Sequence, residues 1–314
     1  MNKILIEVPT WLGDCVMATP AIENIIKKYP NIKITIFGSF VSTAIFEEHP
    51  NVEHIVLDES KKSSSRLKWI YTTAKELGEF EVALTFRRTL FSKLFIWFTK
   101  ANKKGYYKRY TKEEVHLVKR YNEFIDRTFN IKEAPKDLKI YFKPFKYKRA
   151  TLGINPGASY GSAKRWYPKK FAKVAIELHR EYYIVIFGGS AEIEIANDIE
   201  NELKRESVQC ENLAGETTIK ELCQKIGGLD LFITGDSGPM HVAAAFKVPT
   251  VAIFGPTKDQ ETSQWMNPQG FIVKREMECA PCMKRVCPLG HHECMKLIEP
   301  NDVLNKIKDI ISKN

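Results

Sequence analysis

The segment Leu231–His241 reads LFITGDSGPMH, a short apolar run followed by a turn and the start of a helix. Backbone N–H groups at such a helix start lack intrahelical partners and carry the positive end of the helix dipole, which suits a phosphate. His241 could reach the same anion, and Asp236 could accept hydrogen bonds from hydroxyls. Alternatively, Asp236 or Ser237 only caps the helix and His241 packs beneath it. The segment alone supports both interpretations equally.

Two further loops in the second half of the chain, at residues 156–166 and 188–194, follow expected strands. Loops after the strands of a doubly wound sheet lie at one edge, so these segments predict a single nucleotide-diphosphate site. Its parts are glycines and Ser159 for close backbone approach, Lys164 as a point charge, Gly238 at the helix start, and Glu192 as an acceptor from ribose hydroxyls. For Lys164 alone, a solvated charge beside a packed Trp166 is the alternative.

The sequence has no P-loop, no GxGxxG and no DxD motif. These absences argue against a kinase, a dehydrogenase and a metal-dependent sugar transferase. A lysine and a helix dipole can neutralise a leaving diphosphate without a metal. We therefore expect no catalytic metal and no cofactor.

Asp14 follows the first expected strand of the chain, at the position where open α/β sheets place their ligand. A carboxylate in a partly desolvated cleft has a raised pKa and can take a proton from an attacking hydroxyl. The alternative is that Asp14 only caps the helix that begins there.

The elements that must position these residues follow a strand–helix rhythm that runs twice through the chain. In the first half, strands are expected at 4–8, 32–37, 52–57 and 82–86. In the second half they are expected at 151–155, 183–187, 211–213, 231–234 and 250–254. Helices fill the intervals, which indicates two parallel α/β sheets facing a cleft. We predict domains at residues 1–146 and 147–300 and a last helix at 301–314, with 143–149 as the linker.

Length, composition and charge narrow the class of protein. The chain has 314 residues, 44% of them hydrophobic, and a formal net charge of +10. Between Lys61 and Arg120 sixteen Lys or Arg residues stand against five Asp or Glu, so the first half is expected to meet an anionic partner. The opening MNKILIEV enters a strand pattern directly and no long apolar run follows, so we expect a cytoplasmic protein without a signal peptide.

Four of the seven cysteines are clustered in CAPCMKRVCPLGHHEC, at Cys279, Cys282, Cys287 and Cys294. Four thiols with two interspersed histidines could hold a structural zinc ion. The short spacing between Cys282 and Cys287 leaves buried thiols or a labile disulfide as alternatives. The scattered cysteines are expected to be core residues in a reducing compartment.

The motifs PTWLGDCVMATPAI, NPGASYGSAKRWYP, NLAGETTIKEL and GDSGPMHVAAAFKVPTVAIFGPT occur in that order along nearly the whole chain. In these motifs the chain resembles the bacterial lipopolysaccharide heptosyltransferases of glycosyltransferase family nine. The AKRW and AGET segments are most similar to those of the heptosyltransferase II type.

This resemblance implies a GT-B fold, with two Rossmann-like domains and the last helix crossing back onto the first. It implies an inverting, metal-independent transfer of heptose from ADP-L-glycero-β-D-manno-heptose to the heptosyl-Kdo-lipid A inner core. Heptosyltransferase I or III activity is the alternative. A sugar-nucleotide epimerase and a basic nucleic-acid-binding protein are further alternatives, although no nucleic-acid-binding motif is recognised.

The resemblance also implies roles for single residues. Asp14 is the candidate base, and the candidate donor-binding residues are Ser159, Lys164, Glu192, Thr217, Thr218, Asp236, Ser237, Gly238 and His241. A lipid-linked acceptor carries phosphates and carboxylates, and it would be met at the cytoplasmic membrane face by Arg87, Arg88, Lys93, Lys108 and Arg109. A solvated basic surface without a fixed ligand is the alternative for any one of these cations.

Overall fold

The computed structural model describes residues 1–157 and 161–312 and divides into two compact units, Met1–Phe142 and Lys143–Asn314. The division falls close to the predicted boundary at residues 146 and 147. Each unit has its own sheet and its own hydrophobic core, and each is described by itself below.

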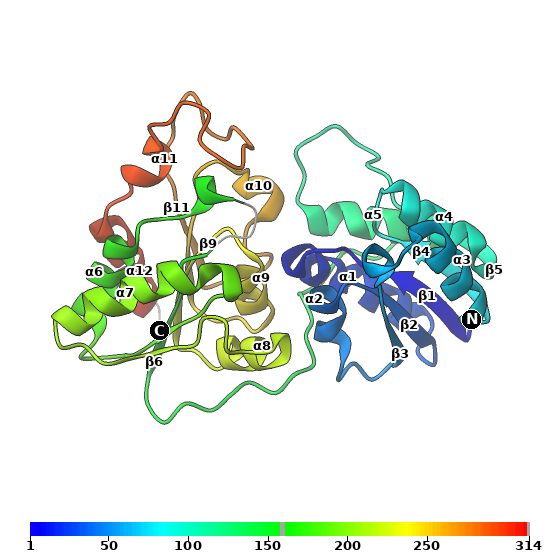
Figure 1. Ribbon diagram of the computed structural model, residues 1–314, viewed down its shortest axis with the longest axis horizontal. Coiled ribbons are helices and arrows are strands. Elements are labelled where there is room, and N and C mark those ends of the chain that lie inside the picture. Colours follow the sequence, from blue (N-terminus) through cyan, green and yellow to red (C-terminus); the bar gives the residue numbers. More distant parts are fainter. Residues whose placement is uncertain (158–160, 313–314) are drawn as a thin grey trace. The chain divides into compact units, whose positions relative to one another are not determined.

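The first unit is a five-stranded parallel sheet in the order β3-β2-β1-β4-β5, with helices between successive strands (Figure 1). Its core contains Leu5, Phe37, Phe80 and Phe95. The elements of this unit are, in chain order, β1 (Lys3–Glu7), α1 (Leu12–Lys28), β2 (Lys33–Gly38), α2 (Phe40–Thr43), β3 (Val52–Leu57), α3 (Arg66–Glu76), β4 (Glu79–Thr85), α4 (Leu90–Phe98), β5 (Lys100–Tyr106) and α5 (Leu117–Phe129).

The second unit is a six-stranded parallel sheet in the order β11-β10-β9-β6-β7-β8 (Figure 1). Its elements are, in chain order, β6 (Thr151–Asn155), α6 (Pro168–Leu178), β7 (Tyr183–Ile186), α7 (Ile193–Arg205), β8 (Cys210–Asn212), α8 (Ile219–Gly227), β9 (Leu231–Gly235), α9 (Gly238–Ala245), β10 (Thr250–Ile253), α10 (Asp259–Thr262), β11 (Gly270–Val273), α11 (Glu293–Lys296) and α12 (Pro300–Ile311).

Central strands of the second sheet are buried on both faces because helices cover the two sides. Every residue of β6, β9 and β10 is buried, which explains their continuous apolar sequences. All polypeptide segments that leave the carboxyl ends of β6, β7 and β9 start from the same edge of this sheet, because the strands are parallel. The two predicted α/β sheets are confirmed.

The last helix, α12, packs within the second unit. Val303, Ile307 and Ile310 are buried in the core cluster that contains Leu152 and Trp166. The apolar stripe of α12 is thus covered by its own unit, and the expected contact with the first unit stays a prediction. Pro300 at the first helical turn and the short connection from α11 direct the helix back onto α6.

No helix in the described part of the chain is both long enough and apolar enough to cross a bilayer.

Candidate functional site

The turn between β9 and α9 presents the amino end of a helix. Ser237 precedes α9 in an extended conformation, and within the described residues its side chain makes no capping hydrogen bond to that helix. Its Oγ instead lies 3.1 Å from Thr234 Oγ1 and 3.3 Å from Asn155 Nδ2. The Met240 N–H donates to the Ser237 carbonyl oxygen at 3.1 Å, but the Ser237 side chain does not cap α9, which favours the anion-binding interpretation over simple capping.

Lys164 and Asp236 form an ion pair at this turn. Lys164 Nζ is 2.5 Å from Asp236 Oδ2, and it also donates to the Asp236 carbonyl oxygen at 3.2 Å. Thr257 Oγ1 donates to the same carboxylate oxygen at 2.7 Å. Both charged side chains are nearly buried, with 12% and 6% exposed. The pair fixes the loop after β6 against the turn after β9 and holds an ammonium group beside the start of α9.

Glu192 lies under the loop that follows β7. It is buried, and its Oε2 accepts a hydrogen bond from the Gly189 N–H at 2.9 Å, while its Oε1 has no partner among the described residues. A Cβ added to Gly157 would lie 2.0 Å from Glu192 Cγ, so only glycine fits there. Glu192 therefore keeps one buried carboxylate oxygen without a hydrogen bond among the described residues, and Gly157 is the residue that makes room for its side chain.

The remaining predicted donor residues have less defined environments. Thr218 caps α8: its Oγ1 accepts from the Glu221 N–H at 3.2 Å and donates to Glu221 Oε2 at 2.9 Å. Thr217 is half-buried beside it, and His241 is buried on α9. Ser159 lies outside the described residues.

In the first unit, Asp14 lies half-buried in the first turn of α1. Burial raises the pKa of Tyr107 and Tyr121; the Asp14 carboxylate raises both further, and the Arg88 guanidinium lowers both. Asp14 and Arg88 thus influence the pKa values of the same two phenols in opposite directions.

Arg87 belongs to a buried cluster of charged side chains in the first unit. Its Nη1 is 3.0 Å from Asp58 Oδ2 and 3.4 Å from Glu7 Oε1, and its Nε donates to the Val8 carbonyl oxygen at 2.8 Å. Burial raises the pKa of Glu7, and Arg87 partly opposes this shift. The Arg87 side chain is 9% exposed, whereas the neighbouring Arg88 is exposed. These contacts favour Arg88 over Arg87 as a ligand contact.

The other predicted acceptor-binding cations lie on the surface. Lys93 is exposed on α4. Arg109 donates from Nε to the Thr111 carbonyl oxygen at 3.0 Å, and Lys108 Nζ lies 5.3 Å from the centre of the Tyr110 ring. Arg109 therefore stabilises the loop after β5, and binding of an acceptor by these residues stays a prediction.

The clustered cysteines share one small cavity of about 20 Å³. Backbone N–H groups of His292, Leu289, Gly290 and His291 point to the Cys287 sulfur and lower the pKa of this thiol. Among the described residues, no group of three or more His, Cys, Asp or Glu side chains is arranged to hold a metal ion. The zinc prediction therefore stays a prediction for the four residues that line this cavity, Cys279, Cys282, Cys287 and Cys294.

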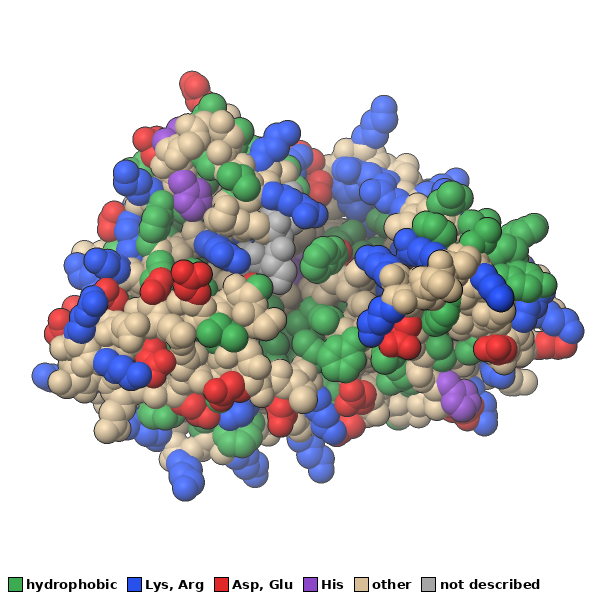
Figure 2. All heavy atoms as spheres, viewed as in Figure 1, with side chains coloured by type: hydrophobic (Ala, Val, Ile, Leu, Met, Phe, Trp, Pro, Cys, Tyr) green, Lys and Arg blue, Asp and Glu red, His purple; other side chains and the backbone are tan. Residues whose placement is uncertain are grey.

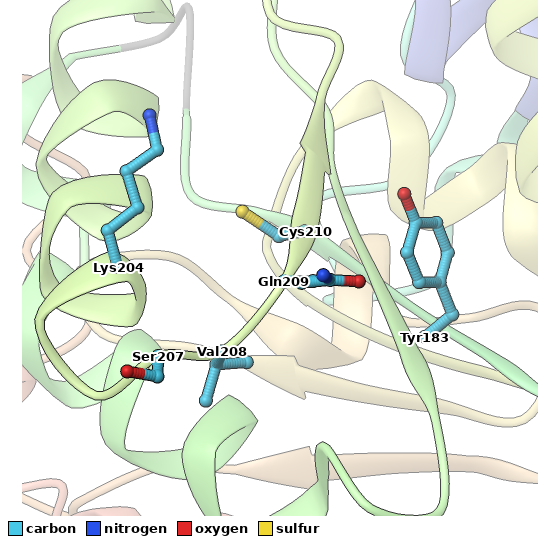
Figure 3. A pocket seen from close by; sticks show the side chains of 6 residues that line it. All are labelled: Tyr183, Lys204, Ser207, Val208, Gln209 and Cys210. Carbon is cyan, nitrogen blue, oxygen red and sulfur yellow. The ribbon is translucent and has the colours of Figure 1, made fainter.

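A larger hollow, of about 410 Å³, lies at the opposite edge of the second sheet. Figure 3 shows Tyr183 and Lys204 on its two sides with Cys210 between them. Tyr183 and Cys210 are the first residues of β7 and β8, so the hollow is at the amino ends of these strands. The hollow is therefore separate from the candidate phosphate-binding residues, which follow the carboxyl ends of the strands.

Sequence reasoning did not identify Asn155 and Thr257. Asn155 Nδ2 donates to the Gly157 carbonyl oxygen at 3.3 Å as well as to Ser237, and Thr257 bonds Asp236. Both residues stand at or just after the carboxyl end of a central strand, β6 or β10. This position in the sequence could have identified both residues, since polar residues at the carboxyl ends of parallel strands lie at the edge of the sheet where ligands bind.

Comparison with known proteins gives consistent matches over the full chain. Lipooligosaccharide heptosyltransferase 2 of Campylobacter jejuni subsp. jejuni serotype O:2 is 43% identical, and the match covers 99% of each chain. Among solved structures, glycosyl transferase family 9 from Veillonella parvula has a TM-score of 0.84 at 20% identity, covering 100% of this chain and 98% of that one.

The structure of Escherichia coli ADP-heptose LPS heptosyltransferase II has a TM-score of 0.81 at 23% identity and covers 99% of both chains. These likenesses confirm the GT-B fold. The pattern described as glycosyltransferase family 9 (heptosyltransferase) matches residues 29–293. With its two parallel sheets and these full-length matches, the chain therefore belongs to glycosyltransferase family 9, the heptosyltransferases.

Proposed function

We propose that this enzyme transfers L-glycero-D-manno-heptose from ADP-heptose to the heptosyl-Kdo-lipid A inner core, which is the heptosyltransferase II activity. The full-length similarity to lipooligosaccharide heptosyltransferase 2 supports this choice of reaction. The observation that carries the proposal is the Lys164–Asp236 pair beside the uncapped start of α9. An ammonium group beside the positive end of the α9 dipole fits a sugar diphosphate.

The positively and negatively charged donor-binding residues would bind different parts of ADP-heptose. Lys164 and the amino end of α9 would hold the two phosphates, so negative charge on departing ADP is met without a metal. The Asp236 carboxylate would accept hydrogen bonds from heptose hydroxyls. The buried Oε1 of Glu192 would accept one from a ribose hydroxyl, which would satisfy its missing partner.

Asp14 would act as the general base. Its carboxylate takes the proton of an acceptor hydroxyl, whose oxygen attacks the anomeric carbon from the face opposite the diphosphate. The new glycosidic bond forms as the bond to the ADP oxygen breaks, which inverts the configuration. General-base assistance of this kind is worth roughly 10²–10⁴-fold in rate.

The acceptor would bind to the basic surface of the first unit, with Arg88 as its best-placed cation. A lipid-linked acceptor carries phosphates and carboxylates, which complement an exposed guanidinium group. Because such an acceptor is anchored in a bilayer, the enzyme would work at the cytoplasmic face of the membrane as a peripheral protein.

The Asp14→Asn variant tests the role of the base. We expect kcat to fall by roughly 10²–10⁴-fold, because the amide cannot take the proton, while the ADP-heptose Kd changes less than about threefold. Turnover is followed by mass measurement of the product and donor affinity by calorimetry. Asp137→Asn, which changes an exposed carboxylate of the same unit, is the control. Near-normal turnover of Asp14→Asn would remove Asp14 from the role.

The choice of acceptor is tested separately. The wild-type enzyme is mixed with ADP-heptose and either mono-heptosylated or non-heptosylated Kdo-lipid A. We expect the mass increase of one heptose on the mono-heptosylated acceptor. Transfer to the non-heptosylated acceptor alone would instead assign heptosyltransferase I activity, and alteration of ADP-heptose without any acceptor would assign an epimerase.

A further inference from the structure

The surface formed by α3 and α4 in the first unit exposes large apolar side chains that the reaction does not use. Leu67 and Tyr71 on α3 are 49% and 46% exposed, and Leu90 and Trp97 on α4 are 67% and 62% exposed. We call these four residues the α3–α4 face. Figure 2 shows hydrophobic side chains gathered over these helices, with Lys and Arg around them.

Helical spacing and ring contacts place these side chains on one surface. Leu67 and Tyr71 are four residues apart, and Leu90 and Trp97 seven, so each pair lies on one side of its helix. The ring of Phe98 connects the helices: its centre is 5.1 Å from that of Tyr71 and 5.0 Å from that of Trp97. The exposed residues therefore form a continuous patch rather than scattered apolar positions.

Basic side chains surround the patch. Lys75 Nζ lies 5.7 Å from the centre of the Tyr71 ring, and Lys104 Nζ donates to the Trp97 carbonyl oxygen at 2.5 Å. Lys68 is exposed on α3 beside Leu67. From Lys61 to Lys104 the sequence has eleven Lys or Arg residues and three Asp or Glu. The charge around the patch is thus strongly positive.

We propose that the α3–α4 face docks the enzyme on an anionic lipid bilayer, with the aromatic and leucine side chains entering the interfacial region and the lysines contacting lipid headgroups. Exposed Trp and Tyr next to Lys are typical of membrane interfaces, where an amphipathic ring has both an apolar and a polar environment. The positive charge complements an anionic leaflet. This inference deepens the proposed function, because a lipid-linked acceptor resides in such a bilayer.

Vesicle sedimentation tests the proposal with the full chain and with neither donor nor acceptor present, so its result is independent of the transferase assay. Vesicles of phosphatidylethanolamine with phosphatidylglycerol are compared with vesicles of phosphatidylcholine. We expect the wild type to bind the anionic vesicles more tightly. The Leu90→Gln/Trp97→Gln variant should bind them about tenfold or more weakly, because it loses the apolar side chains that insert.

A second variant separates charge from apolar insertion. Lys68→Gln/Lys75→Gln should weaken binding to the anionic vesicles roughly tenfold at low salt, with a smaller difference at high salt. The matched control is Met266→Gln/Leu297→Gln, which removes two similarly exposed apolar side chains of the second unit, 55% and 49% exposed. This control should bind like the wild type. Circular dichroism of each variant establishes that it is folded.

Three results would overturn the proposal. The first is equal vesicle binding by Leu90→Gln/Trp97→Gln and the wild type, and the second is wild-type binding to neither vesicle. The third is a lipid-free dimer in analytical ultracentrifugation that Leu90→Gln/Trp97→Gln converts to a monomer, since the face would then join two copies of the chain. Patch variants that bind vesicles poorly yet transfer heptose to a deacylated, water-soluble acceptor would support both the docking and the proposed function.

Discussion

Arg87 and Arg88 are neighbours in the sequence, yet their side chains have different environments. The Arg87 guanidinium is buried with Glu7, Asp58 and a backbone carbonyl group, whereas Arg88 is exposed. One arginine therefore stabilises the end of β4, and the other remains accessible to a ligand.

Substitution of each arginine should separate stability from binding. Arg87→Ala leaves the Glu7 carboxylate buried without its cation, so we expect a loss of about 3–5 kcal/mol in the free energy of unfolding. Arg88→Ala should change stability by no more than about 0.5 kcal/mol and raise the acceptor KM roughly tenfold. Urea unfolding and steady-state kinetics measure the two effects.

Removal of the Glu7 charge, which Arg87→Ala leaves without its cation, is the internal control for this variant. Adding Glu7→Gln should recover part of the lost stability, because a neutral amide is less costly to bury than an unpaired carboxylate. A stable Arg87→Ala variant with an impaired acceptor KM would instead make Arg87 a ligand contact.

The sequence identified several residues of the candidate donor site because they occupy strand carboxyl ends, where a parallel sheet places its ligand. Lys164 and Asp236 are far apart in the chain, and their 2.5 Å ion pair depends on the pairing of β6 with β9. The spacing of residues along the sequence does not show that Lys164 and Asp236 are in contact. The burial of Arg87 could not be predicted either, because no feature of the sequence around Arg87 identifies Glu7 and Asp58 as its ion-pair partners.

At the scale of elements, the sequence predicted most strands but missed β5 and β11. Both are edge strands, each paired on one side only. β5 reads KANKKGY and is largely exposed, so it lacks the apolar pattern by which strands are recognised. Lysines on an edge strand also discourage pairing with other chains, which explains a sequence so unlike that of a central strand. β11, GFIV, is only four residues long.

The loop after β6 gives an element-scale prediction through Gly157. A Cβ at this position would lie 2.0 Å from Glu192 Cγ, so Gly157→Ala must displace the buried glutamate or the loop. We expect the Kd for ADP to rise about tenfold, equivalent to about 1.4 kcal/mol, while unfolding remains cooperative. Isothermal titration calorimetry measures the affinity.

A double-mutant cycle checks the cause of that loss. In a Glu192→Ala background the clash is absent, so the added Gly157→Ala substitution should cost little further ADP affinity. If the two substitutions weaken ADP binding additively, the effect of Gly157→Ala does not act through Glu192. The close approach of Gly157 to Glu192 would then not determine the affinity for ADP.

At the scale of the whole molecule, each of the two units has a hydrophobic core of its own. One is built around Phe37 and Phe95, and the other around Leu152, Trp166 and the apolar stripe of α12. The rhythm of strands and helices predicted this division. The placement of α12 could not be predicted from its sequence, because an amphipathic stripe shows that a helix packs but not which sheet it covers.

Because the predicted phosphate-binding residues all belong to the second unit, ADP should protect that unit specifically. A ligand that binds only the folded state stabilises it by about 2.7 kcal/mol at a concentration of 100 Kd. Hydrogen exchange followed by mass spectrometry should therefore show slower exchange in peptides that cover residues 188–192 and 235–241, with unchanged exchange in β1, β2 and β4. Protection of those first-unit strands, with none at 235–241, would place the ADP site in the other sheet and remove Lys164 and Asp236 from donor binding.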